Sequence, residues 1–346
     1  MIFKVSQSKV KTWRRCHQAY QFKYVEELRR KKKSRPLQFG SMIHSALERH
    51  FNGDEFTEYF DELRRDVEAM RLFQLERDEF GNILEDCEDI MADYVEYWKY
   101  YGLRPIRRKG RGAEHEFEIE LLPDVVWEGK IDFIAKTKGK LKVLGEHKTY
   151  TRKPNDDDRW RDLQSATYFR AIDILGWPTL DACLWDYIKS KPPAIPGVLK
   201  DGSISTKKID TLPSTIDRVI ASSPTSAGNT KPENLRALRS MAEKSRNEYF
   251  HRVITPVNSN VVDKVFEDFV STVVDLVENH GKKQDMNIDK HCSWCDYESI
   301  CRARLQGMDV DYVKQREYTH GNSKPNKEAS KTHRASVDKP TDKKSR

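Results

Sequence analysis

The spacing of apolar residues predicts a helical first part of the chain. Over residues 6–28, 40–51, 54–78 and 82–101, apolar or aromatic side chains recur at intervals of three and four residues. This period places them on one side of a helix, where they can pack against a core. Ser6 is a candidate N-cap for the first of these four helices.

The pattern of the next part predicts β-strands. Residues 115–122 alternate between apolar and polar, and two β-rich segments, 125–136 and 140–148, flank the sequence Thr-Lys-Gly, which suits a hairpin turn. Further along, we expect helices at 159–176 and 258–280, strands at 182–190 and 250–257, and surface loops at 191–213 and 222–232.

Composition limits the class of protein. The chain has 346 residues, 37% hydrophobic and 34% charged, which is enough for one large domain or two modest ones. The N-terminus lacks the apolar run of a signal peptide, and no stretch approaches the roughly 18 apolar residues of a membrane span. We therefore expect a soluble cytoplasmic protein without a membrane partner. The polar composition of residues 306–346 predicts a disordered basic tail.

The positive charge is unevenly distributed. The net charge is +7, of which the predicted tail carries +4, so the body of the protein is not a strongly basic binder. A local basic run over 29–35 contains Arg30, Lys31 and Lys32. These side chains either form a solvated helix end or contact the phosphates of a nucleic acid, and the sequence leaves both interpretations open.

Two carboxylates and a lysine lie on the predicted hairpin. Glu146 and Lys148 are two residues apart in one strand and so share a face, while Asp132 lies in the preceding strand. A surface ion pair would explain Glu146 and Lys148 alone. If Asp132 and Glu146 converge across the hairpin, however, their repulsion favours a hard cation such as Mg²⁺ or Mn²⁺ between them. A lysine beside such an ion suits the metal-assisted hydrolysis of a phosphodiester.

Two helical motifs flank the hairpin in the sequence. Gln164 and Tyr168 share a helix face at i and i+4, as do Gly40, His44 and Glu48. Taken singly, a buried core histidine or a mixed polar and aromatic helix would account for either motif. Together with the acidic pair, they form an ordered set.

That ordered set resembles the RecB-like nucleases of the PD-(D/E)xK superfamily. The resemblance covers residues 1–305, with a helical insertion at about 52–110. It implies an α/β fold of the restriction-endonuclease type, with a central mixed sheet flanked by helices, a helical N-terminal region and a cysteine-rich C-terminal segment. It also implies roles for single residues: metal ligation by His44, Asp132, Glu146 and the backbone carbonyl of His147, catalysis by Lys148, and orientation of the active site and of the nucleic-acid strand by Gln164 and Tyr168.

The cysteines suggest a second metal site. Cys292, Cys295 and Cys301 follow the spacing C-x2-C-x5-C, and zinc could bind there with His291 or the distant Cys16 as fourth ligand. The chain also resembles an iron–sulfur subset of RecB-like nucleases, including CRISPR-associated and AddB-type domains. In that subset, one N-terminal cysteine and three C-terminal ones bind a [4Fe–4S] cluster that joins the two ends of the domain. His17 departs from this pattern, because a proline usually follows the first cysteine.

The resemblance implies a metal-dependent DNA exonuclease acting on single strands or DNA ends. A DNA-binding recombination accessory protein held together by a metal, without catalysis, is the alternative from another class, and a structure-specific endonuclease would use the same fold. Because the chain has no helicase motif, a helicase or recombination partner would supply any unwinding. Phage or bacterial DNA metabolism is the expected setting.

Overall fold

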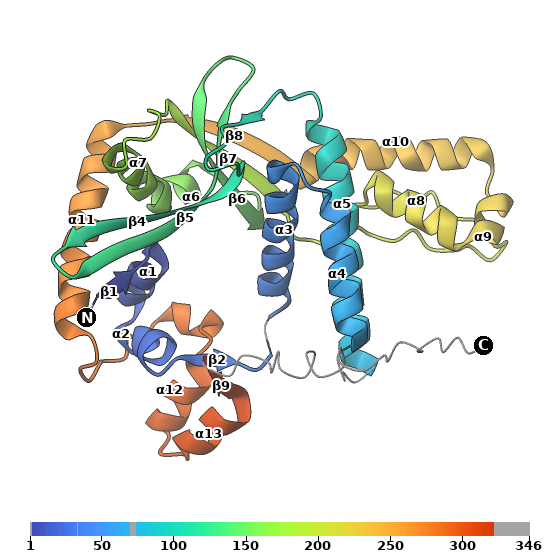
Figure 1. The fold of residues 1–346 in the computed structure, drawn as a ribbon. Helices are drawn as coiled ribbons and strands as arrows, with labels where there is room; N and C mark the ends of the chain where they lie inside the picture. Colours follow the sequence, from blue (N-terminus) through green and yellow to red (C-terminus); the bar gives the residue numbers. More distant parts are fainter. Residues whose placement is uncertain (1, 33, 70–73, 322–346) are drawn as a thin grey trace, which may run out of the picture. The chain divides into compact units, whose positions relative to one another are not determined.

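The computed structural model describes residues 2–32, 34–69 and 74–321 (Figure 1). The chain forms two compact units. The first contains Met1–Gln7 and Lys33–Val274, and the second contains Ser8–Lys32 and the chain from Asp275 onward. Segments near both ends of the sequence thus form the second unit, while the first residues and the middle of the chain form the first.

A mixed sheet forms the centre of the first unit. Strand β5 pairs with four others and runs parallel to β1, while β6 runs parallel to β7 and the remaining pairs are antiparallel. The seven strands are β1 (Phe3–Val5), β3 (Arg104–Pro105), β4 (Ala113–Leu122), β5 (Val125–Lys136), β6 (Lys142–Tyr150), β7 (Ala182–Lys189) and β8 (Phe250–Pro256).

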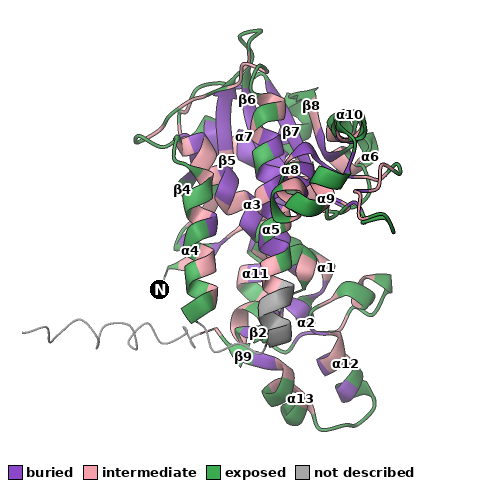
Figure 2. Cartoon of the chain, turned by 90° about the vertical axis from the view of Figure 1, so that its right-hand side faces the viewer, coloured by how far each residue is buried: buried purple, intermediate pink, exposed green. Residues whose placement is uncertain are grey.

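Helices cover both faces of this sheet. One face packs against α3 and α5 in a core that includes Phe133 and Leu184, and β5, β6 and β7 are largely buried (Figure 2). At the other face α7 lies against β6, and Phe269 of α11 packs 5.0 Å from Trp127 of β5. The helices are α3 (Arg35–Asn52), α4 (Phe56–Ala69), α5 (Gln74–Trp98), α6 (Asp156–Arg161), α7 (Gln164–Ile174), α8 (Pro213–Ser222), α9 (Pro224–Asn229), α10 (Pro232–Tyr249) and α11 (Ser259–Asn279).

The expected fold class is confirmed: the protein is α/β, with a central mixed sheet flanked by helices. The loop predicted over 222–232 instead contains α9. In the part of the chain that the structure describes, no helix combines the length and apolar character needed to cross a membrane.

The second unit is a small helical body with a two-stranded antiparallel sheet. Its core contains Phe22, Leu28, Tyr297 and Ile300, which come from both ends of the sequence. Its elements are α1 (Gln7–Arg15), α2 (His17–Tyr20), the π-helix η1 (Gln21–Val25), β2 (Leu28–Arg30), the 3-10 helix η2 (Lys290–Trp294), α12 (Glu298–Leu305), α13 (Val310–Glu317) and β9 (Tyr318–His320), which pairs with β2.

The predicted helix over 6–28 is interrupted at Cys16. This residue is extended, with φ −166°, and separates α1 from α2. The break ends the first helix at Arg15 and leaves Cys16 at a junction, buried in the core of the second unit. The apolar spacing predicted one continuous helix, because the residues on both sides of the break face the same core.

The boundary of the predicted tail requires a correction. Residues 306–320 are not disordered: Asp309 caps α13 by accepting a hydrogen bond from the Tyr312 N–H (2.9 Å), and β9 pairs with β2. Tyr318 is only 3% exposed and stacks on Tyr297, so one aromatic side chain anchors this otherwise polar segment. The remainder of the predicted tail, from 322 onward, lies outside the described residues.

Candidate active site and cysteine cluster

The acidic pair lies at the point where the pairing of β5 with β6 reaches its last register positions. That pairing runs from Lys136 opposite Lys142 to Phe133 opposite Gly145, and the next positions in the same register are Asp132 and Glu146. The Phe133 ring lies over Gly145 so closely that a Cβ there would meet ring carbon at 2.0 Å. Glycine at 145 therefore allows the register that sets the two carboxylates opposite each other.

Asp132 connects three elements of the first unit. Its Oδ2 accepts a hydrogen bond from the His147 N–H at 2.7 Å and lies 4.0 Å from His44 Nδ1 on α3. Burial lowers the pKa of His44, even though the Asp132 carboxylate acts in the opposite direction. The imidazole is thus kept neutral, which is the form that ligates a metal.

Glu146 is a buried carboxylate with an unsatisfied oxygen. It is 1% exposed, and its Oε2 forms an ion pair with Lys148 Nζ at 3.0 Å. Oε1 has no hydrogen-bond partner among the described residues. Burial raises the pKa of Glu146, and the nearby Asp132 charge raises it further, while Lys148 opposes both. A buried charge without full compensation is costly, so this environment favours uptake of a proton or of a positively charged ligand.

Lys148 bridges two carboxylates. Besides Glu146, its Nζ lies 3.2 Å from Asp162 Oδ2. Burial alone would lower the pKa of Lys148, but the charges of Glu146 and Asp162 raise it above its ordinary value. The amine therefore remains protonated at neutral pH and acts as a fixed positive charge rather than as a base.

Gln164 and Tyr168 lie beside this group on α7. Tyr168 is 5% exposed and packs edge-on against Phe117, with ring centroids 5.7 Å apart. Burial and the Glu146 charge raise the pKa of Tyr168, and a hydrogen bond with Gln164 partly offsets them. The two side chains predicted to act together thus contact each other, next to Glu146.

The side chain of His147 points to the opposite face of the sheet from Glu146 and Lys148. Its Nδ1 lies 3.3 Å from Asp186 Oδ2, and its ring packs 4.7 Å from that of Phe133. Arg252 binds Asp186 through two nitrogens, each 3.1 Å from a carboxylate oxygen, and donates a hydrogen bond to Tyr94 at 2.8 Å. This buried network lies on the face of the sheet to which the His147 side chain points, and it restrains the β6 backbone there. It thereby also restrains the position of the His147 carbonyl.

Glu114 is a site residue that the sequence analysis missed. Ligand atoms of His44, Glu114 and Asp132 all lie within 4.8 Å of one another, and that group does not include Glu146. Glu114 also forms a 2.6 Å ion pair with Lys130, and its φ of 54° interrupts the alternation of β4, so that three successive residues are buried. A left-handed residue other than glycine leaves no signal in the hydrophobic pattern. Asp162 was also missed, although it precedes Gln164 by only two residues.

These donors suit a hard divalent cation. Two carboxylates and a neutral imidazole converge at His44, Glu114 and Asp132. Mg²⁺ and Mn²⁺ prefer oxygen ligands, and Mn²⁺ also accepts imidazole.

Comparison with known proteins identifies the family. The family model of the PD-(D/E)XK nuclease superfamily matches residues 4–302. The chain belongs to this superfamily. No curated protein matches the chain. A solved structure titled "Crystal structure of SSO0001" aligns at 11% identity and a TM-score of 0.29, covering 78% of this chain and 98% of that one. So low a score adds nothing to the argument about the fold.

Membership in the PD-(D/E)XK superfamily gives the geometry a chemical meaning. The superfamily consists of nucleases that use divalent metals, so the protein is a metal-dependent nuclease, and His44, Glu114 and Asp132 form a group that could hold such a metal ion.

Glutamine in place of Glu146 is expected to stabilise the metal-free nuclease increasingly as pH rises. A carboxyl group with a raised pKa holds its proton in the folded protein but loses it in the unfolded chain above the ordinary value of 4.5. Between the pKa of the unfolded chain and the raised pKa of the folded protein, the free energy of unfolding therefore falls by up to about 1.4 kcal/mol per pH unit. Urea denaturation in EDTA between pH 5 and 8 should show a widening difference between Glu146→Gln and wild type. Glu116→Gln, at an exposed site on β4, is the control and should show none; a constant difference for Glu146→Gln would contradict the argument.

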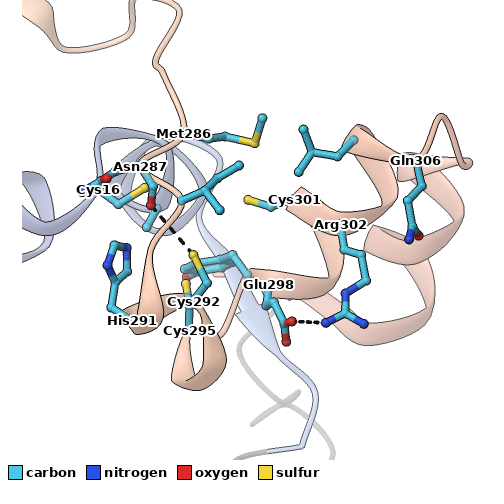
Figure 3. Close-up of a pocket in the computed structure, with 14 residues that line it drawn as sticks. Cys16, Met286, Asn287, His291, Cys292, Cys295, Glu298, Cys301, Arg302 and Gln306 are labelled. Atoms are coloured by element: carbon cyan, nitrogen blue, oxygen red, sulfur yellow. Dashed lines mark hydrogen bonds and ion pairs between the residues drawn. The ribbon is translucent and has the colours of Figure 1, made fainter.

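Four cysteines line one cavity in the second unit. Cys16, Cys292, Cys295 and Cys301 surround a space of about 240 Å³, and Figure 3 shows their sulfur atoms turned toward it. Burial raises the pKa of Cys301 to about 11, with a further contribution from the charge of Cys16. Partly buried cysteine thiols that gather around one cavity are typical of a metal site.

The sulfur atoms of these four cysteines do not form a close group. Around one tetrahedral zinc with Zn–S bonds of about 2.3 Å, the sulfur atoms would lie about 3.8 Å apart. Among the described residues, no three of these sulfur atoms lie within 4.8 Å of one another. His291 also lines the cavity, and its Nε2 has no partner among the described residues. It is thus available either as a ligand or as a hydrogen-bond donor to a bound group.

Two members of the predicted basic run have partners inside the second unit. Arg30 Nε donates to the Asp296 carbonyl at 2.9 Å, and Lys31 Nζ donates to the Gln315 carbonyl at 2.7 Å. These contacts favour a structural role for Arg30 and Lys31. Contact of Arg30, Lys31 and Lys32 with nucleic acid remains a prediction.

Proposed function

We propose that this PD-(D/E)XK protein is a RecB-like DNA exonuclease that uses Mg²⁺ or Mn²⁺ and acts on single strands or DNA ends. The observation that carries the proposal is the buried ion-paired set of Glu146, Lys148 and Asp162, with the orphan oxygen of Glu146 beside Asp132. A protein that only binds DNA gains nothing from carboxylates placed where phosphates must approach, since like charges repel. The preference for strand ends rests on the resemblance to RecB-like nucleases.

The chain's own residues have separable roles in the proposed reaction. His44, Glu114, Asp132, Glu146 and the His147 carbonyl would hold the ion, which when bound lowers the pKa of a water molecule and neutralises charge on the phosphate. Lys148 presents a permanent positive charge that stabilises the negative charge developing on the phosphate oxygens. Asp162, the second carboxylate paired with this amine, helps to hold it in place. Gln164 and Tyr168 position the strand from α7.

We infer that the four cysteines hold a [4Fe–4S] cluster with a structural role. Four thiolates are the usual ligands of such a cluster, and all four cysteines line one cavity. Cys16 is separated from the other three by almost the whole chain. A metal group that closes so long a loop stabilises the fold by restricting the unfolded chain.

Digestion of labelled DNA tests the catalytic proposal. Linear single strands, blunt duplexes and circular single strands are incubated with Mg²⁺ or Mn²⁺, with EDTA as the control. We expect metal-dependent loss of the linear single strand, while the circle survives. Cleavage of the circle would support an endonuclease on the same fold, and binding without cleavage of any substrate would support the non-catalytic accessory protein. If only single strands are degraded, a helicase or recombination partner would have to supply them.

Replacement of Glu114 by glutamine is expected to weaken metal use without abolishing it. The amide keeps one oxygen but loses the charge that Glu114 contributes beside His44 and Asp132. The Mg²⁺ concentration for half-maximal cleavage should rise about tenfold, with a smaller change in the maximal rate. A Mg²⁺ titration of the cleavage rate measures both, and Glu118→Gln on the same strand is the control. An unchanged Mg²⁺ requirement would remove Glu114 from the site.

A further inference from the structure

A groove in the second unit is lined by one face of α1. Ser8, Lys11, Thr12 and Arg15 are spaced at i, i+3, i+4 and i+7 and all line a cavity of about 760 Å³. The opposite face of α1 is buried, and Trp13 there donates a hydrogen bond to Asp275 at 2.7 Å. Packing of the buried side of α1 therefore fixes which side chains its other side presents to this cavity. We call the cavity the α1 groove.

The α1 groove is strongly basic. Its charged lining consists of Lys11, Arg14, Arg15 and Lys23 against one carboxylate, that of Asp296. Lys11, Arg14 and Lys23 are exposed, so their charges can reach a ligand. A concave surface with four cations and one anion is complementary to a run of phosphates. The groove belongs to the second unit, whereas the acidic site belongs to the first.

An exposed indole forms part of the same wall. Trp294 is 64% exposed, and the Arg15 guanidinium lies 5.3 Å from the centre of its ring. Exposed aromatic rings within basic grooves are the platforms on which unpaired bases stack, and a neighbouring arginine strengthens such stacking. Duplex bases are already stacked on each other and cannot use this ring, so the indole favours a single strand over a duplex.

We propose that the α1 groove binds single-stranded DNA, with phosphates against Lys11, Arg14 and Lys23 and a base on Trp294. The inference rests on the proposed function for the identity of the strand and extends it by adding a binding site outside the catalytic one. Both walls are next in sequence to cysteines of the metal cavity: Arg15 precedes Cys16, and Trp294 precedes Cys295. A group bound by those cysteines would therefore also restrain both walls of the groove.

Binding of a fluorescent oligothymidylate, measured by anisotropy in EDTA so that no cleavage occurs, tests the stacking contact. Trp294→Ala should weaken binding about tenfold, and Trp294→Phe should restore most of it. The exposed side chain makes unfolding of the variant unexpected, and its iron content checks that the cysteine site is intact. Wild-type affinity in Trp294→Ala would overturn the proposal, as would an equal loss for a blunt duplex of the same length.

The salt dependence of the same measurement tests the phosphate contacts. Removing two lysines in Lys11→Ala/Lys23→Ala should lower the slope of log K against log salt by about 1.4, since each phosphate contact on a single strand contributes about 0.7. Lys207→Ala/Lys208→Ala, in the first unit, is the charge-matched control. An unchanged slope in the first pair would place the strand elsewhere. Since none of these measurements involves cleavage, they remain decisive even if the nuclease proposal fails.

Discussion

Lys148→Ala is expected to reduce the rate of DNA cleavage by about 10²–10³-fold, the usual effect of removing one preorganised group that stabilises charge in a transition state. Glu146 and Asp162 keep this amine protonated and fix it within 3.0 and 3.2 Å of their oxygens. Its charge is thus in place before the reaction begins. Single-turnover digestion of a labelled strand at saturating Mg²⁺ measures the loss in the chemical step.

The control for this variant is Lys142→Ala. Lys142 lies on the same strand, β6, but is exposed at its start, so its removal should leave the rate unchanged. Circular dichroism and affinity for DNA in EDTA establish that Lys148→Ala is folded and still binds. Equal cleavage by Lys148→Ala and wild type would mean that a contaminating nuclease is responsible, and the catalytic assignment would fall.

Cys292→Ala is expected to lose its iron completely and to become poorly soluble. The proposed cluster takes ligands from segments near both ends of the sequence, and its loss would remove the link between them. Iron and acid-labile sulfide analysis of anaerobically purified protein, together with its visible absorption, measures the loss. Cys16→Ala and Cys301→Ala should behave in the same way, because each removes one ligand of the same group.

Cys87→Ala is the matched control for the cysteine variants. Cys87 is fully buried among apolar side chains of the first unit, and burial raises the pKa of its thiol, as expected of a core residue with no metal. This variant should keep its iron and its brown colour. A brown, soluble Cys292→Ala protein would rule out the proposed ligation, and stoichiometric zinc in place of iron in the wild type would support the alternative metal.

Local patterns predicted the secondary structure and several of the contacts around the candidate site. The hairpin strands, the pairing of Glu146 with Lys148 on one face and the helical spacing of Gln164 and Tyr168 all depend on periods of two or about four residues, which the sequence displays directly. The position of Asp132 opposite Glu146 needed only the hairpin register. The roles of these residues, in contrast, came from the resemblance to a family and not from any period.

The other features of the candidate site and of the fold depended on contacts between distant segments of the chain. Glu114 reaches His44 and Asp132 through a left-handed backbone position, Asp162 reaches Lys148 from a separate loop, and Tyr318 orders a polar segment by stacking on one ring.

The sequence by itself therefore determined the secondary structure around the site, the α/β class and the local pairs of side chains, since these follow from spacings of a few residues. Only the tertiary structure decided which acids converge, that residues 306–320 are folded and which face of α1 lines a groove. Such features arise from packing between segments up to hundreds of residues apart, and no local pattern records which partner a side chain will meet.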